Sequence, residues 1–161
     1  MTQYRLRTLT GVLLVLFALP VAFMHARVRA QQGDSGAPTQ ALTFDGDTAL
    51  WTMAIKPDKT ADFEKVMTRL REALQKSSDP QRKQQAAGWR VMKISKPLAD
   101  GNIAYVHIIH PVVSGADYTI MKALYDAFPE ERQSLYESYR GAFDKNLSLA
   151  TGTVVVDLSK N

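Results

Sequence analysis

The apolar residues of this chain change their spacing several times, and the order of these changes limits the possible folds more than any other feature. In Ala49–Lys56 (ALWTMAIK), apolar residues occupy both sets of alternate positions, which is typical of a β-strand covered on both faces. From Thr60, a residue suited to cap a helix, apolar residues recur every three or four positions: Phe63, Val66, Met67, Leu70, Ala73 and Leu74. The folded part of the chain is therefore predicted to begin with a strand followed by an amphipathic helix.

The same patterns predict the rest of the chain. Ser78-Asp79 provides a cap for a short helix that begins at Pro80 and stops at Gly88. Asp100-Gly101 supplies the turn of an antiparallel hairpin, and the β-branched run at the end of the chain indicates a last strand. The predicted elements are a helix at Pro80–Ala87, strands at Trp89–Ser95 and Ile103–Pro111, helices at Asp117–Phe128 and Pro129–Phe143, and a strand at Thr151–Leu158.

This order of strand, helix, strand, strand, helix, strand predicts an α+β domain of the ferredoxin-like βαββαβ type. Its four-stranded antiparallel sheet would carry helices on one face only. Two helices cannot hide the strands' apolar residues, which are Trp51, Met53, Ile55, Val91, Tyr105, Ile109, Val154 and Val156. Because an exposed apolar sheet favours aggregation, we expect a second copy of the chain to cover the other face, giving a homodimer.

The formal charge of +4 comes from the N-terminal region. Asp and Glu are absent before Gln31, and four of the 20 Lys and Arg residues lie there: Arg5, Arg7, Arg27 and Arg29. The remaining 16 basic residues balance the 16 acidic ones. A neutral body argues against nucleic acid as a partner, because it lacks a general attraction for phosphate. The absence of Cys excludes disulfides, thiolate metal sites and a cysteine nucleophile.

Residues 1–30 have the order of a secretory signal peptide. Arg5 and Arg7 precede the apolar stretch Leu9–Met24, and Val28-Arg29-Ala30 suits cleavage near Ala30. We therefore expect an exported protein, periplasmic or extracellular in a bacterium. The alternative is an uncleaved membrane anchor, although this stretch is shorter than the ~20 residues of a usual spanning helix. Residues 31–44 are expected to form a flexible linker, and residues 45–161 the folded domain.

The segments ALWTMAIKPDKTADFEKVMTRLREAL, GWRVMKISKP and IAYVHIIHP resemble the dimeric α+β barrel superfamily, which includes antibiotic-biosynthesis-monooxygenase-like proteins. They look most like small exported bacterial members without assigned activity. The resemblance implies a homodimer, and it admits both enzymes and domains without known chemistry. Haem-degrading members use an Asn, a Trp and a His; no Asn matches here, since Asn102 lies in a turn and Asn146 follows the last predicted helix. No cofactor is therefore expected.

His107 is the residue best suited to chemistry. It lies within an apolar strand three positions before His110, so the two rings should point to opposite faces and cannot share a metal. No metal site is therefore predicted. His107 is predicted to be either a buried or interface histidine, or a general base or polar group beside a ligand cavity. The residues predicted to line such a cavity are Trp51, Tyr105, His107 and Tyr118.

Two functions remain open on this reading. The first is binding of a small apolar or aromatic molecule, or assembly, by a homodimer. The second is a cofactor-independent, monooxygenase-like reaction on a small aromatic or quinol compound, with His107 as the base. A deep pocket that reaches His107 favours the enzyme, and side chains that fill this space favour the non-catalytic protein.

Overall fold

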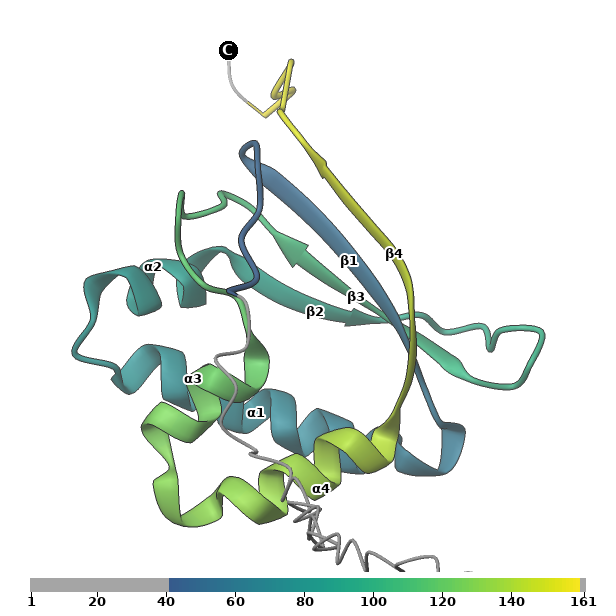
Figure 1. The fold of residues 1–161 in the computed structure, drawn as a ribbon. Helices are drawn as coiled ribbons and strands as arrows, with labels where there is room; N and C mark the ends of the chain where they lie inside the picture. The colour runs from purple at the N-terminus through teal and green to yellow at the C-terminus, as the bar shows by residue number, and fades with distance from the viewer. Residues whose placement is uncertain (1–40, 160–161) are drawn as a thin grey trace, which may run out of the picture. The chain divides into compact units, whose positions relative to one another are not determined.

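Four strands form one antiparallel sheet in the computed structural model, which describes residues 41–159 (Figure 1). The order across the sheet is β2-β3-β1-β4, so the two strands that are central come first and third along the chain. The strands are β1 (Thr48–Ile55), β2 (Trp89–Lys93), β3 (Ile103–Ile109) and β4 (Phe143–Gly152). The predicted α+β class and four-stranded antiparallel sheet are confirmed, whereas the predicted signal sequence lies outside the described residues.

Helices α1, α3 and α4 lie on one side of the sheet, and α1 contacts each of the other helices (Figure 1). The bounds are α1 (Thr60–Lys76), α2 (Pro80–Gly88), α3 (Ile120–Ala127) and α4 (Arg132–Ala142), with one-turn 3-10 helices η1 (Pro57–Lys59) and η2 (Pro129–Glu131). The predicted cap of α2 is confirmed, because Asp79 accepts a 2.8 Å hydrogen bond from the backbone N–H of Gln81. Thr60 was expected to cap α1 but is its first helical residue, and the preceding Lys59 makes no side-chain cap.

The predicted position of the last strand, Thr151–Leu158, is wrong. β4 instead occupies Phe143–Gly152, directly after α4, and the β-branched residues 153–156 lie beyond it. β4 is an edge strand with nearly all of its residues exposed. Since few of its side chains are buried, the strand does not need alternating apolar residues. Its position follows from pairing with β1, where Trp51 lies opposite Leu149 and Ile55 opposite Phe143.

The core lies between the helices and one face of the sheet. Its buried members are Met53, Ile55, Phe63, Val66, Leu70, Leu74, Tyr105, Ile120, Ala123, Leu124, Leu135 and Ala142. Met53, Ile55 and Tyr105 belong to the apolar set that two helices were not expected to hide completely, and the chain's own helices cover these three. The opposite side, here called the open face, carries Leu50, Met92, Val106 and Ile108, on which no helix of residues 41–159 packs (Figure 1).

A smaller cluster fixes the start of the folded part. Phe44 is buried against Tyr118, with ring centroids 4.9 Å apart, and Leu42 accepts a 2.7 Å hydrogen bond from the Tyr118 backbone N–H. Asp117 accepts hydrogen bonds from the backbone N–H groups of Leu42 and Thr119. Leu42 and Phe44 lie in the range that was predicted to be a flexible linker, but these contacts hold them against the domain. Helix α3 begins at Ile120 rather than at the predicted Asp117.

Candidate functional site

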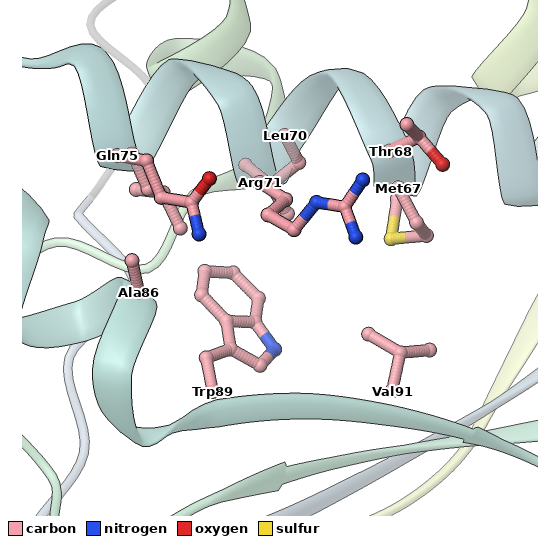
Figure 2. Close-up of a pocket in the computed structure, with 9 residues that line it drawn as sticks. Met67, Thr68, Leu70, Arg71, Gln75, Ala86, Trp89 and Val91 are labelled. Atoms are coloured by element: carbon pink, nitrogen blue, oxygen red, sulfur yellow. The ribbon is translucent and has the colours of Figure 1, made fainter.

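A groove of about 270 Å³ lies between α1 and the edge strand β2 (Figure 2). Its lining surface is polar and apolar in about equal parts, and the lining residues are Met67, Thr68, Leu70, Arg71, Leu74, Gln75, Ala86, Trp89 and Val91. Trp89 and Val91 project from β2 toward α1, where the side chain of Arg71 leaves the helix on the facing side (Figure 2).

The indole of Trp89 forms the floor of this groove and is fixed from behind. Its Nε1–H donates a 3.0 Å hydrogen bond to Nδ1 of His107. Its ring also packs edge-on against Tyr118, with centroids 5.4 Å apart. Since the only polar atom of the indole is already bonded inward, the ring offers the groove a rigid apolar surface.

His107 lies next to Trp89 in the core and has no exposed surface. Burial lowers the pKa of the imidazole to about 4, so the ring is neutral at pH 7. Because an indole N–H can only donate, Nδ1 must accept, and the single ring proton resides on Nε2. That Nε2–H has no hydrogen-bond partner among residues 41–159.

The residues predicted to line a cavity with His107 are divided between two parts of the core, with Tyr105 in the larger cluster and Tyr118 in the smaller one. The Trp51 ring lies 5.0 Å from that of His107, and its Nε1–H donates to Asn146 at 2.9 Å. Tyr105 is buried, and its hydroxyl donates to Glu64 at 2.5 Å. The hydroxyl of the buried Tyr118 accepts a 2.8 Å hydrogen bond from the backbone N–H of Val113. None of these four residues is among those that line the groove. Of the other three, only Trp51 packs directly against His107, whereas Tyr105 packs on Phe63 and Tyr118 on Trp89.

None of the nine lining residues belongs to the predicted site, and Arg71 and Trp89 are the two whose chemistry matters most for a ligand. Arg71 is exposed and takes part in no hydrogen bond or ion pair within the described part of the chain. Its spacing was a signal, because it follows Met67 by four positions and precedes Leu74 by three, which places a cation at the border of the apolar stripe. The pattern alone could not predict that Trp89 lies in the same groove as Arg71, since it follows Arg71 by 18 positions and α2 lies between them.

Other kinds of site find little support in the described residues. Over residues 41–159, His, Asp and Glu nowhere gather in threes that could hold a metal ion. The exposed His110 lies apart from His107, with Nδ1 2.9 Å from Oγ1 of Thr48. None of the helices between residues 41 and 159 is long and apolar enough to cross a membrane.

Comparisons of the chain with protein-family models, curated proteins and solved structures find no match. The function must therefore be argued from the groove and its neighbours.

Proposed function

We propose that this protein binds a small apolar or aromatic molecule in the groove between α1 and β2. The observation that carries the proposal is the fixed indole of Trp89, bonded to His107 on one side and forming the floor of the groove on the other. Ligand pockets combine apolar walls with a few polar groups and begin at about 300 Å³. The groove, of about 270 Å³ and with both apolar and polar lining residues, lies just below that size and suits a compact molecule of one or two rings.

The surroundings of His107 support binding rather than catalysis. A general base needs an unprotonated nitrogen within reach of the substrate. Here Nδ1 accepts from Trp89 and Nε2 carries the proton, while the whole side chain is buried behind the groove. His107 thus acts as a positioning residue that orients Trp89.

A larger side chain at the edge of the groove should block the binding of a ligand. Ala86 lines the groove at the end of α2, and the neighbouring Ala87 is exposed outside it. With 2-naphthalenemethanol as the probe in isothermal titration calorimetry, Ala86→Phe should lower affinity at least tenfold, and the matched Ala87→Phe should leave it unchanged. Absence of binding to the unmodified protein, or equal binding to both variants, would refute the proposal.

We further propose that the domain is a ferredoxin-like member of the dimeric α+β barrel group, with two copies packed through their open faces. Leu50 is 43% exposed and Met92 45% exposed on that face, beside the half-buried Val106 and Ile108. A two-fold axis would set this apolar surface against its own copy, which is the commonest arrangement in homo-oligomers. Sedimentation equilibrium should give a dimer that Leu50→Glu dissociates, whereas Leu158→Glu, on the exposed tail, should not. A monomeric unmodified protein would overturn this part of the proposal.

The proposal includes export, on the evidence of residues 1–30 alone. Sequencing of the N-terminus of the protein recovered from a bacterial periplasm or medium should begin at Gln31. Recovery of uncleaved chain in the membrane fraction would instead support an anchor.

A further inference from the structure

We infer that the ligand of the α1–β2 groove is an aromatic carboxylate, held by Arg71 above the indole of Trp89. This inference rests on the proposed function and specifies its ligand class. Arg71 is the only ionisable residue among those that line the groove, and its side chain leaves α1 on the side that faces Trp89 and Val91 (Figure 2).

The charge of Arg71 is available to a ligand. The neighbouring Arg69 is bound to Glu72 and Glu131, and Lys93, two residues beyond Val91, is paired with Glu64 at 2.9 Å. Arg71 has no such acidic partner within residues 41–159. The groove therefore presents one unbalanced positive charge, which is complementary to a singly charged anion.

The donor geometry favours a carboxylate. The guanidinium is a planar fork that matches the two oxygens of a carboxylate. Gln75 lies one helical turn after Arg71 on the same groove wall, and it makes no hydrogen bond within the described range, so its amide N–H groups can supply a further donor. A single cation balances one carboxylate but not the nearly doubled charge of a phosphate monoester.

The remaining walls select the body of the ligand. Leu70, Leu74, Ala86 and Val91 offer only apolar contacts, and the sulfur of Met67 suits the edge of an aromatic ring. The indole of Trp89 provides a flat surface against which a ring can stack. A flat apolar ring with one carboxylate can stack on Trp89 and pair with Arg71 at the same time.

The test compares two probes of the same shape, 2-naphthoate and uncharged 2-naphthalenemethanol, by isothermal titration calorimetry on the full folded protein. We expect 2-naphthoate to bind about tenfold more tightly. Arg71→Gln should remove this advantage and leave the affinity for the alcohol unchanged. Arg71→Lys should retain part of it, because the charge remains without the fork. The matched control is Arg140→Gln, an exposed arginine of α4 outside the groove, which should bind both probes as the unmodified protein does.

The outcomes separate the two proposals. Equal affinity for the two probes, or an advantage for the carboxylate that survives Arg71→Gln, overturns the carboxylate inference and leaves the binding function standing. Absence of binding for both probes overturns both.

Discussion

Trp89 lies diagonally across the β2–β3 pair from His107, and its indole N–H reaches Nδ1 of the imidazole at 3.0 Å. The bond can form only while Nδ1 is unprotonated, because a doubly protonated ring would turn a donor toward a donor. The rigidity of the groove floor is therefore linked to the neutral state of a buried histidine. The first prediction follows from this link.

The free energy of unfolding should depend on pH through His107. Its pKa is about 4 in the folded protein against an ordinary value of 6.5, so between these values the unfolded chain binds a proton that the folded protein does not. The contribution of His107 to stability is thus complete above pH 6.5, and about 3 kcal/mol of it is lost as the pH falls to 4. Denaturant unfolding of the unmodified protein between pH 4 and 7 should show this slope, and His107→Leu should flatten it.

The matched control is His110→Ala, which removes the exposed histidine and should preserve the slope. Carboxylates whose pKa is lowered, such as Glu64 and Asp117, add acid sensitivity of their own, but they are present in every variant. The same pH dependence in His107→Leu as in the unmodified protein would contradict the assignment.

A second prediction concerns the contact between α1 and β3. The hydrogen bond from the Tyr105 hydroxyl is the largest cause of the lowered pKa of Glu64, and the bond from Lys93 comes next. Tyr105→Phe should therefore raise the pKa of Glu64, as measured by carboxyl NMR titration. Tyr139→Phe, at a tyrosine whose pKa burial raises to about 12, is the control and should leave Glu64 unaffected. An unchanged pKa in Tyr105→Phe would contradict the bond.

Two glycines with nearly the same backbone conformation allow a third prediction. Gly46 and Gly101 have φ values of 81° and 82°, but a Cβ on Gly46 would run into the carbonyl oxygen of Gly152, whereas one on Gly101 meets nothing within 4 Å. Gly101→Ala should cost only the ~1–2 kcal/mol of the left-handed conformation. Gly46→Ala should cost at least ~2 kcal/mol more, because the backbone must move. Equal losses in thermal unfolding would show that the contact with Gly152 is absent.

The position of β4 gives a fourth prediction. Val155 is 92% exposed and Leu158 94% exposed in the tail beyond the strand. Val155→Ser and Leu158→Ser should each change the free energy of unfolding by less than ~0.5 kcal/mol. Ile109→Ala, at a fully buried position of β3, should cost ~2–5 kcal/mol in the same assay. A large loss for the tail variants would restore the strand predicted at residues 151–158.

The sequence predicts those elements whose apolar pattern the fold uses. β1 and α1 were located closely because Met53, Ile55, Phe63 and Leu70 are all buried in the core. β3 was found for the same reason, whereas the largely exposed edge strand β2 was found from its β-branched and aromatic residues and from the Asp100-Gly101 turn that joins it to β3. β4 could not be found this way, because an exposed edge strand needs no apolar period, and strand propensity measures fit to a half-buried surface.

The candidate site was predictable only in part. Strand alternation explains why Trp51 lies opposite His107 on one face, but Tyr105 and Tyr118 belong to different core clusters, and none of the four lines the groove. What their hydroxyl and ring nitrogen atoms bond to depends on tertiary contacts, such as Glu64 meeting Tyr105 from α1. The groove joins residues of α1, α2 and β2 that are distant in the sequence, so local spacing does not encode it.

The floor of the groove has one more use. The chain contains only two tryptophans, Trp51 and Trp89, and both ring N–H groups are bonded to different partners. In a Trp51→Phe background, Trp89 is the only tryptophan, so tryptophan emission comes from it alone. Binding of a ligand against that indole can then be followed by the change in tryptophan fluorescence, without an added label.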